Sequence, residues 1–263
     1  MNHHEFLSLN VSDEFVATLS LARPDKQNAL NFEMWAALPE LLVHALDQGC
    51  RVLVVTGEGA HFCSGADIDS LGTSLNDVGV EDGYRAMNDR AELALATFPR
   101  PTIAAIRGNC IGGGCQLALA CDLRMSDTSA RFGITPAKLG VLYPSLSIER
   151  TAQLVGVSTA KRLLFTGDTI DATEALRLGL IDYLVDSDAF ENSLRKLIET
   201  VASRSLLTQL HVKEVLAQET TSSPSQLTER WKRFLAEAND LDEGLAAYKE
   251  KRRPLFAWTP EPT

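Results

Sequence analysis

Two short apolar runs, each followed by a glycine-bearing turn, constrain the fold more than any other feature of this chain. The runs are Arg51–Gly57 (RVLVVTG) and Thr102–Arg107 (TIAAIR). Runs of this length that are rich in Val, Ile and Ala are typical of strands buried on both faces. The glycines 112–114 then open an apolar helical run, CQLALAC. Strands that alternate with helices predict an α/β fold with parallel strand pairing.

Hydrophobic periodicity predicts further elements on both sides of these runs. Asn31 can cap a helix that continues to about Gln48, because its side chain can accept from the free N–H groups of a first turn. A second helix, about Gly83–Thr97, should end before Pro99 and Pro101, since a residue that precedes proline disfavours the helical conformation. The remaining predicted elements are the strands Phe6–Asn10, Phe15–Leu21 and Asp122–Ser126, a turn at Arg23–Asp25, and the helices Phe190–Ser203, Leu206–Gln218, Ser225–Asn239 and Leu241–Lys251.

After about Ser187 the alternating pattern gives way to consecutive helices. We therefore expect two regions: a mixed α/β core over residues 1–200 and a helical region over residues 201–263. A row of helices at the end of a chain is typical of an oligomerisation arm. No repeat, low-complexity tract or long linker interrupts the chain.

The charge balance makes several classes of protein unexpected. The chain has 25 Lys+Arg against 35 Asp+Glu, a net charge of -10. Nucleic-acid-binding proteins and proteins of anionic membrane surfaces need a basic surface, so we expect no nucleic acid and no membrane as partners. The longest uncharged stretch, Gly108–Cys121, has 14 residues; a bilayer span takes about 20. No secretory signal is visible at the start of the sequence.

The cysteines indicate the redox compartment. Their number is odd and their spacing is not that of paired metal ligands, so we expect reduced thiols, a cytoplasmic protein and no metal. They are Cys50, Cys63, Cys110, Cys115 and Cys121.

The glycines that follow both strands point to a chemical role. Glycine lets a backbone approach a ligand closely and leaves N–H groups free to point outward. Two such N–H groups that converge on one point would stabilise an oxyanion formed during a reaction. The alternative is a tight turn that only packs a helix on the sheet, and either loop alone leaves both interpretations open.

Six segments, in this order and spacing, resemble the enoyl-CoA hydratase/isomerase (crotonase) superfamily over nearly the whole chain. They are RPDKQNAL at 23–30, HFCSGADI at 61–68, GGGCQLALACDL at 112–123, FGITPAKLG at 132–140, LLFTGDTIDATEALRLGLID at 163–182 and EGLAAYKEKRRPLF at 243–256. The resemblance implies a crotonase-like α/β spiral of ββα units as an acyl-CoA-binding and catalytic core. It implies a helical C-terminal region that forms trimers or dimers of trimers. The implied substrate is an acyl-CoA thioester, with coenzyme A as part of the substrate and no separate cofactor.

The resemblance also implies roles for single residues. It places the oxyanion hole at the backbone N–H groups of Ala66 and Gly113. It places the early turn against the adenine and pantetheine of coenzyme A, and Lys251 against its phosphates, often on a neighbouring subunit. The implied substrate- and coenzyme-A-binding residues are Lys26, Asn28, Ala29, Ser64, Gly65, Ala66, Asp67, Ile68, Gly113, Gln116, Pro136 and Lys251.

Three of these assignments have a simpler alternative. The early turn can be a plain strand-to-helix connection. The Asp67 side chain can be an N-terminal helix cap, which is the interpretation we favour for it. Lys251 can be the solvated end of a charged helix.

Two positions depart from the pattern of the family's hydratases, which use two glutamates. Gln116 and Pro136 stand in those places. An amide cannot take up a proton as a carboxylate does, and the loss of each general acid or base costs about 10²–10⁴-fold. A further position, which dienoyl-CoA isomerases use for an aspartate, holds Pro144. An efficient two-glutamate hydratase is therefore not expected.

Thr135 and Tyr143 are the protic residues left in this segment. FGITPAKLGVLYP resembles methylmalonyl-CoA decarboxylases, which have a threonine-proline pair and a tyrosine in the same places, although they can carry histidine where this chain has Ala66. Loss of CO₂ needs no base, only stabilisation of an enolate and a later proton donor. We therefore expect decarboxylation, or a similar carbon–carbon cleavage, of a small carboxyacyl-CoA, with Ala66, Gly113, Tyr143 and Thr135 as the catalytic residues.

Two alternatives stay open. One is enoyl-CoA hydration or double-bond isomerisation with an acid from another position, of which Glu149 is a weak candidate. The other is a non-catalytic acyl-CoA-binding protein. His61 is expected to be a turn or surface residue, and Cys63, Cys110 and Cys115 to be small buried side chains.

Overall fold

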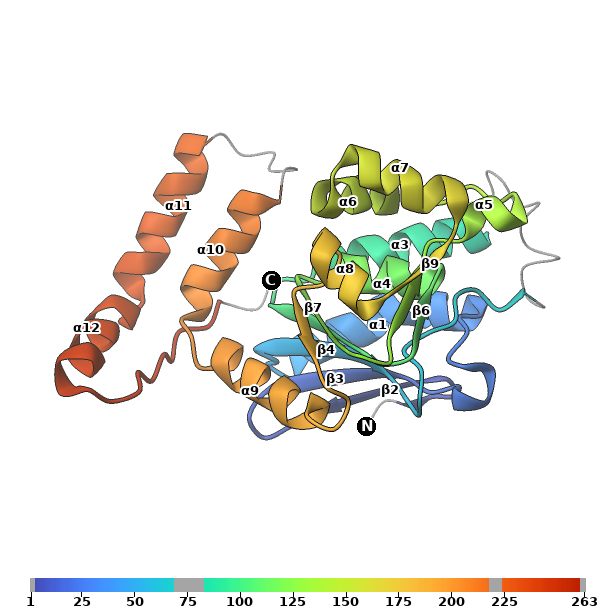
Figure 1. Cartoon of the computed structure of the whole chain (residues 1–263). Helices are drawn as coiled ribbons and strands as arrows, with labels where there is room; N and C mark the ends of the chain where they lie inside the picture. Colours follow the sequence, from blue (N-terminus) through green and yellow to red (C-terminus); the bar gives the residue numbers. More distant parts are fainter. Residues whose placement is uncertain (1–2, 69–82, 218–223, 261–263) are drawn as a thin grey trace.

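The computed structural model describes residues 3–68, 83–217 and 224–260 and contains two β-sheets flanked by helices (Figure 1). The larger sheet has the strand order β1-β2-β3-β4-β5-β7-β10, and the smaller sheet has the order β6-β8-β9. The strands are β1 (His3–His4), β2 (Leu7–Val11), β3 (Val16–Leu21), β4 (Val52–Gly57), β5 (Thr102–Ile106), β6 (Asn109–Ile111), β7 (Leu123–Asp127), β8 (Arg131–Gly133), β9 (Thr169–Asp171) and β10 (Tyr183–Val185). The helices are the 3-10 helix η1 (Pro24–Lys26) and the α-helices α1 (Phe32–Asp47), α3 (Tyr84–Ala96), α4 (Gly113–Ala120), α5 (Pro136–Leu139), α6 (Ser145–Val155), α7 (Val157–Thr166), α8 (Ala172–Leu178), α9 (Phe190–Ala202), α10 (Leu206–Leu216), α11 (Pro224–Glu237) and α12 (Asp240–Glu250).

The larger sheet places the two glycine-bearing loops side by side. From β3 to β10 its strands pair in parallel, as the alternating pattern predicts. β4 and β5 are neighbours, with Val55 opposite Ala104. Because parallel strands end at the same edge of a sheet, the loops after β4 and β5 meet there. Only β1, β2 and β3 pair antiparallel among the described strands of this sheet.

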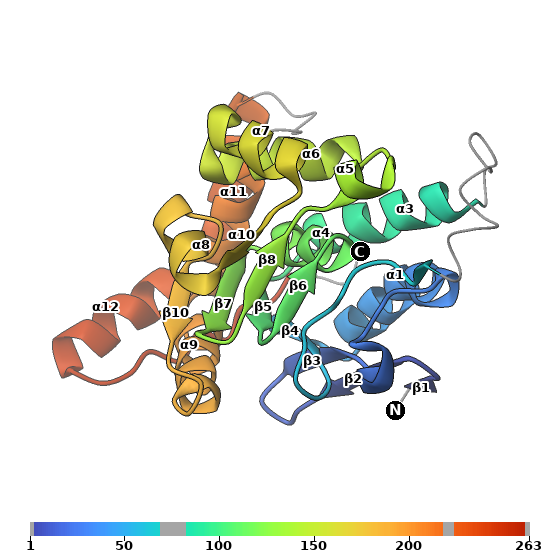
Figure 2. The same ribbon diagram turned by 45° about the vertical axis from the view of Figure 1, so that its right-hand side comes forward.

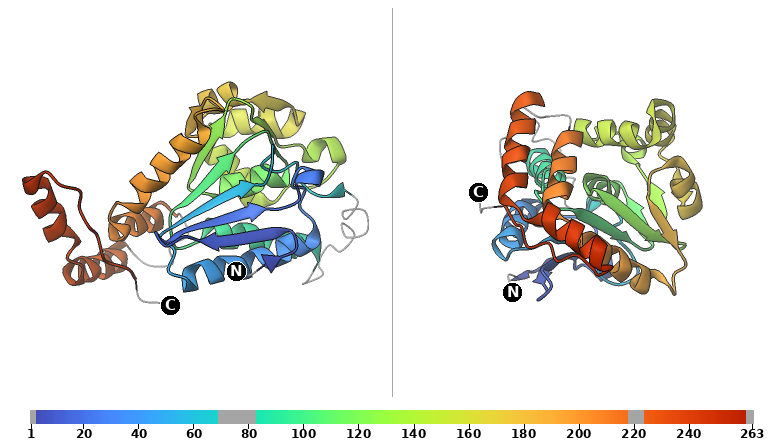
Figure 3. Two further views of the ribbon diagram at one scale, coloured as in Figure 1. Left: turned by 90° about the horizontal axis from the view of Figure 1, so that it is seen from below. Right: turned by 90° about the vertical axis from the view of Figure 1, so that its left-hand side faces the viewer.

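The central strands are buried on both faces. In β4, Leu53 and Val55 belong to the hydrophobic cluster that includes side chains of α1, α3 and α4. Val54 points the other way and packs with Phe190 of α9. This two-sided burial explains why the strand is an unbroken apolar run rather than an alternating one. Figure 3 shows the strands fanned side by side.

The smaller sheet brings a distant segment against the second glycine loop. β6 pairs in parallel with β8, with Ile111 opposite Gly133. A separate bridge pairs Leu30 with Ala66 and so joins the early turn to the first glycine loop. Four segments that are far apart in the sequence therefore meet at one edge of the larger sheet.

Most predicted elements agree with the structure to within one or two residues. Asn31 caps α1 as predicted, since its Oδ1 accepts from the Met34 N–H (3.0 Å). The expected helix end at Gln218 lies outside the described residues. The strands β1, β6, β8, β9 and β10 and the helices α5 and α8 were not predicted, because elements this short carry little periodicity. The ten-residue helix α7 was not predicted either.

The helices α10–α12 stand to one side of the sheet (Figure 1), and α12 extends away from the rest of the molecule (Figure 2). α10 is tied to the core through Lys213, whose Nζ donates to the Arg100 carbonyl (3.0 Å) and to Asp122 (2.7 Å). Large apolar side chains on this arm are exposed, among them Leu216 at 73% and Tyr248 at 85%. Within the described ranges, no helix is both long enough and apolar enough to cross a bilayer.

Candidate functional site

Two backbone N–H groups come together where the glycine-bearing loops meet. They belong to Ala66 and Gly113, the two residues that the resemblance names. A methyl carbon on Gly113 would lie 3.8 Å from the Ala66 nitrogen, and one on Gly65 would lie 3.8 Å from the Gly113 nitrogen. In the described part of the chain, neither N–H has a hydrogen-bond acceptor. Two free donors at one point can receive an oxyanion.

The orientation of the Ala66 N–H is fixed by a hydrogen bond to the carbonyl group of the same peptide unit. The Gly65 carbonyl belongs to that unit and accepts from the Leu30 N–H (2.8 Å). Because a trans peptide unit is planar, with its C=O and N–H in opposite directions, holding the carbonyl also holds the N–H. The bond from Leu30 therefore keeps the Ala66 N–H facing away from the early turn.

The Gly113 N–H is held in the same way. Its peptide unit includes the Gly112 carbonyl, which accepts from the Tyr143 hydroxyl (3.0 Å) and from the Gln116 backbone N–H (3.0 Å). Gly113 is also the first residue of α4, whose start has no side-chain cap. The partial positive charge of a helix N-terminus therefore adds to the pull of this donor on an anion.

Glycine is required where the two loops approach each other. Gly65 has φ +107° and Gly112 has φ +51°, in the region that disfavours side chains. A methyl carbon on Gly114 would lie 2.6 Å from the Cys63 carbonyl oxygen, which leaves no room for it. The glycine pattern that the sequence displayed is thus a requirement for bringing the two N–H groups together.

The early turn is built around Asn28, which is fully buried and has φ +57°. Its Oδ1 accepts from the Arg23 N–H (2.9 Å), and its Nδ2 donates to the carbonyls of Glu58 (2.9 Å) and His61 (2.6 Å). The His61 ring, half-buried, accepts from the Asn109 N–H (3.1 Å), as expected of a turn residue. The buried Asn28 side chain therefore holds the backbone of the early turn, which the resemblance places against coenzyme A.

A salt bridge that sequence reasoning missed joins this turn to the first glycine loop. The Arg23 Nη2 lies 2.8 Å from the Asp67 Oδ2, with both side chains mostly buried. The Arg23 Nη1 donates to the Ala29 carbonyl (2.7 Å), and its guanidinium stacks 5.0 Å from the centre of the Phe6 ring. The predicted helix-capping role of Asp67 concerns the segment that follows it, and residues 69–82 of that segment lie outside the described residues.

The other predicted binding residues have different positions. Lys26 is exposed at the end of η1, and the Ser64 hydroxyl donates to its carbonyl (3.3 Å). Ala29 is buried, whereas Ile68 is 65% exposed. Lys251 is exposed at the end of α12, on the arm that stands apart from the sheet. Within one chain the structure therefore does not bring Lys251 to the glycine loops.

The segment with the expected protic residues lies against the second glycine loop. A methyl carbon on Gly112 would lie 3.8 Å from the Thr135 Oγ1. Pro136 is the first residue of α5, where a missing N–H costs nothing. Burial raises the pKa of Tyr143 well above its usual range, so that its phenol keeps its proton at neutral pH. Thr135 and Tyr143 thus both approach the Gly112–Gly113 peptide unit.

Gln116 is buried and faces a polar cluster from two other helices. Its Nε2 donates to Asn88 (2.7 Å) and to the Glu92 Oε2 (2.7 Å), and its Oε1 accepts from Asn88 (3.1 Å). The same Glu92 oxygen accepts from the Ser147 hydroxyl (2.8 Å), and the other oxygen pairs with Arg150. Burial raises the pKa of Glu92, and the bonds from Ser147, Arg150 and Gln116 oppose that rise.

Sequence reasoning missed Glu92, although α3 carries a signal for it. Tyr84, Asn88, Glu92 and Leu95 recur at helical spacing, and all four are buried on one face of α3. A carboxylate on the apolar face of a helix needs a partner inside the protein. Glu149, the acid considered from the sequence, is exposed.

The five cysteines are free and buried, and the burial confirms the prediction made for Cys63, Cys110 and Cys115. Burial raises the pKa of Cys63 to about 12 and that of Cys50 to about 11. A thiol that keeps its proton is a poor nucleophile, so these side chains act as small apolar residues.

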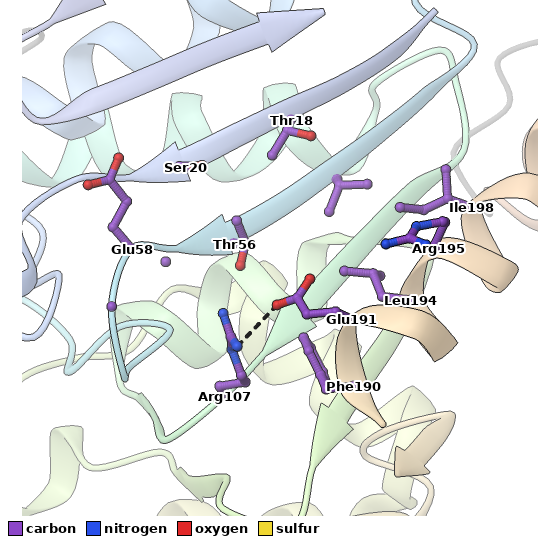
Figure 4. Close-up of a pocket in the computed structure, with 13 residues that line it drawn as sticks. Thr18, Ser20, Thr56, Glu58, Arg107, Phe190, Glu191, Leu194, Arg195 and Ile198 are labelled. Atoms are coloured by element: carbon purple, nitrogen blue, oxygen red, sulfur yellow. Dashed lines mark ion pairs between the residues drawn. The ribbon is translucent and has the colours of Figure 1, made fainter. Parts of the chain in front are cut away.

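A cavity of about 610 Å³ lies between β3, β4 and α9 (Figure 4). Arg107 and Glu191 form an ion pair across it (3.1 Å), and Phe190 packs beneath them. Of the described residues, none that the sequence predicts for the site lines this cavity. The cavity therefore adds nothing to the chemistry of the paired N–H groups.

Comparisons with known proteins show the family of this chain. The sequence profile of the enoyl-CoA hydratase/isomerase family matches residues 12–259. The 2,3-dehydroadipyl-CoA hydratase of Escherichia coli is 33% identical over 248 residues, which cover 92% of this chain and 94% of that protein. The peroxisomal Delta(3,5)-Delta(2,4)-dienoyl-CoA isomerase of Arabidopsis thaliana is 30% identical and covers 94% of each chain. A crystal structure of an enoyl-CoA hydratase/isomerase family member superposes with a TM-score of 0.89 at 32% identity, over 97% of this chain and 98% of that one. The chain therefore belongs to the enoyl-CoA hydratase/isomerase family and has its crotonase fold.

Proposed function

We propose that this protein acts on an acyl-CoA thioester and stabilises the enolate that forms when charge develops at the α-carbon. The observation that carries the proposal is the pair of free N–H groups of Ala66 and Gly113. A thioester carbonyl oxygen placed between them would accept two hydrogen bonds at the moment it becomes negative. Loss of one such donor typically costs about 10²–10³-fold in rate.

The reaction that we favour is decarboxylation of a small carboxyacyl-CoA. The bond between the α-carbon and the carboxylate breaks, CO₂ leaves, and the electron pair passes through the α-carbon to the thioester oxygen held by Ala66 and Gly113. A proton then adds to the α-carbon, which restores the carbonyl. The side chains of Gln116 and Pro136 cannot act as general acids or bases, and no step of this reaction requires them to.

The proton donor that we propose is Tyr143. Its raised pKa means that it carries a proton at neutral pH and can give one up only to a strong base such as an enolate carbon. To do so, the hydroxyl must exchange its bond with the Gly112 carbonyl for one with the substrate. Thr135, whose hydroxyl lies near Gly112, is the residue we assign to the substrate carboxylate.

Enoyl-CoA hydration or isomerisation is the second candidate. The names of the relatives favour it, since the Escherichia coli protein is a hydratase and the Arabidopsis protein an isomerase. An acid is needed for either reaction, and Glu92 has both oxygens engaged by Ser147, Arg150 and Gln116. A non-catalytic acyl-CoA-binding protein is the third candidate, which any turnover would exclude.

We further propose that the chain assembles as a homotrimer or a dimer of trimers through α10–α12. The exposed apolar side chains of Leu216, Leu245 and Tyr248 on this arm support the proposal, since large apolar patches mark contact surfaces. Assembly would let Lys251 of one chain reach the coenzyme A phosphates bound to another. Buried free cysteines agree with a cytoplasmic location.

The test compares two substrates on the purified chain. Methylmalonyl-CoA should yield propionyl-CoA and CO₂, measured by chromatography, whereas crotonyl-CoA should be hydrated far more slowly. If crotonyl-CoA is hydrated with a kcat of about 10–10³ s⁻¹, as is typical of competent enzymes, the second candidate replaces decarboxylation as the proposed reaction. No product from either thioester, with tight binding of both, would support the third.

A further inference from the structure

Glu92 is a buried carboxylate to which the proposed reaction assigns no step. Its side chain is 1% exposed and connects three helices: it lies on α3, contacts Gln116 on α4, and contacts Ser147 and Arg150 on α6. Taking an ion pair such as Glu92–Arg150 out of water is costly, and apolar side chains of the same size would often fill the space with less loss. In some proteins such buried charge clusters contribute conformational specificity rather than stability.

The cluster ends at the oxyanion hole. Gln116 is held through its side chain by Glu92, and its backbone N–H donates to the Gly112 carbonyl (3.0 Å). That carbonyl and the Gly113 N–H belong to one planar unit, so movement of Gln116 turns the N–H. The start of α4 has no side-chain cap, so the link from Gln116 to Glu92 acts together with the Tyr143 hydroxyl on the Gly112 carbonyl to hold the first turn.

An ionised carboxylate is well suited to this task because it only accepts hydrogen bonds. Gln116, Ser147 and Arg150 all donate to Glu92. The Gln116 amide must therefore present its nitrogen to the carboxylate, and the Ser147 hydroxyl must direct its hydrogen there too. A glutamine at position 92 would offer one acceptor oxygen. Arg150 can only donate and would take that oxygen, which sets the new NH₂ group against the Gln116 amide nitrogen. The arrangement around Gln116 could not then stay as it is.

We propose that Glu92 is a positioning residue for the oxyanion hole: it holds Gln116, and through Gln116 the first turn of α4, so that the Gly113 N–H points at the thioester oxygen. The inference rests on the oxyanion hole of the proposed function but not on which reaction follows. A displaced donor weakens the charged transition state more than it weakens ground-state binding. Loss of Glu92 should therefore lower kcat and leave acyl-CoA affinity in place.

The test reads the polarisation of a bound carbonyl directly. The probe is 4-(dimethylamino)cinnamoyl-CoA, whose conjugated thioester absorbs at longer wavelength when its carbonyl oxygen receives hydrogen bonds. The variants are Glu92→Gln and Gln116→Met, which break the same link from its two ends. The control is Asp182→Asn, which breaks the Arg124–Asp182 ion pair (2.9 Å) at a site outside the Glu92 cluster. Each protein is also assayed for kcat, KM and thermal stability.

The wild type should shift the probe to longer wavelength. Glu92→Gln and Gln116→Met should each lose at least half of that shift and about 10-fold or more in kcat, and Glu92→Gln should keep Kd for the probe within about twofold. Asp182→Asn should lower the melting temperature and keep the full shift. If Glu92→Gln fails to fold, the probe shift and kcat of Gln116→Met test the inference instead, because this variant leaves the Glu92–Arg150 pair intact.

Two results would overturn the inference. A full shift and full kcat in both folded variants would show that Glu92 has only a structural role, while the oxyanion hole of the proposed function would stand. A wild type that binds the probe without any shift would remove the oxyanion hole itself, and with it both the proposed function and the role of Glu92.

Discussion

The Tyr143 hydroxyl donates to the Gly112 carbonyl at 3.0 Å, and that carbonyl shares a peptide unit with the Gly113 N–H. A phenol that stands 31 residues along the chain from this turn thus orients one of the two free donors. Tyr143 can therefore affect turnover at two successive steps, by holding the peptide unit while CO₂ leaves and by donating a proton afterwards.

Tyr143→Phe should lower kcat on a malonyl-type CoA by about 10-fold or more, because both roles act on charge that develops in the transition state. The Kd of an unreactive acyl-CoA should change by less than about twofold. Steady-state kinetics and calorimetry measure the two quantities. Tyr183→Phe, which alters a tyrosine that is 41% exposed on β10, is the matched control. An unchanged kcat in Tyr143→Phe would remove this residue from the mechanism.

Thr135→Val should act differently. A threonine hydroxyl that binds the substrate carboxylate does so in the ground state as well, so its loss should raise KM more than it lowers kcat. The comparison to make is between a carboxyacyl-CoA and the same acyl-CoA without the carboxylate. Only the first should bind more weakly; equal weakening of both would contradict the assignment.

Gly113→Pro should abolish most activity because it removes one oxyanion donor, a loss of about 10²-fold or more in kcat. Proline is acceptable at the first position of α4, where the N–H has no helical partner. Gly113→Ala is the control that keeps the N–H. Its methyl group would meet the Leu30 and Trp35 side chains at 3.2 Å, so they must move slightly. Equal kcat in the two variants would refute the role of this N–H.

The buried tyrosines should lower the stability of the folded chain as the pH rises above about 10, the usual pKa of tyrosine in an unfolded chain. The buried cysteines act in the same direction from a lower pH. Burial raises the pKa of Tyr84 to about 12, and it raises that of Tyr143 as well. Above pH 10 the unfolded chain therefore releases protons that the folded chain keeps, which favours unfolding until the pH passes the folded pKa. Melting temperatures between pH 8 and 12 measure the effect, and Tyr84→Phe should make the decline less steep. A decline of the same slope in that variant would contradict the shift.

Substitution of exposed apolar residues on the arm should disrupt assembly without unfolding the core. Leu216→Glu and Tyr248→Glu each place a charge on a surface that the trimer would bury, so light scattering should report smaller species than for the wild type. Val43→Glu is the control: this side chain on α1 is 56% exposed and lies outside the arm. A monomeric wild type, or full assembly in both arm variants, would refute the proposed interface.

The sequence by itself determined the parts of this protein that depend on local composition. Val52–Gly57 and Thr102–Ile106 are continuous apolar runs because both faces of these strands are buried. Gly65 and Gly112 had to be glycine because of their positive φ and the close approach of the two loops. Local requirements of this kind restrict which residue types a position can hold, so the strands, turns and helix starts could be predicted from the sequence.

Tertiary structure alone decided which side chains surround the paired N–H groups. Glu92 and Gln116 are 24 residues apart, and Arg23 and Asp67 are 44 apart, yet each pair is in hydrogen-bond contact. No periodicity records such pairs, because they depend on how α3, α4 and the loops pack against one another. Packing brings segments that are distant in the sequence together, and it thereby decides which charged residues become partners.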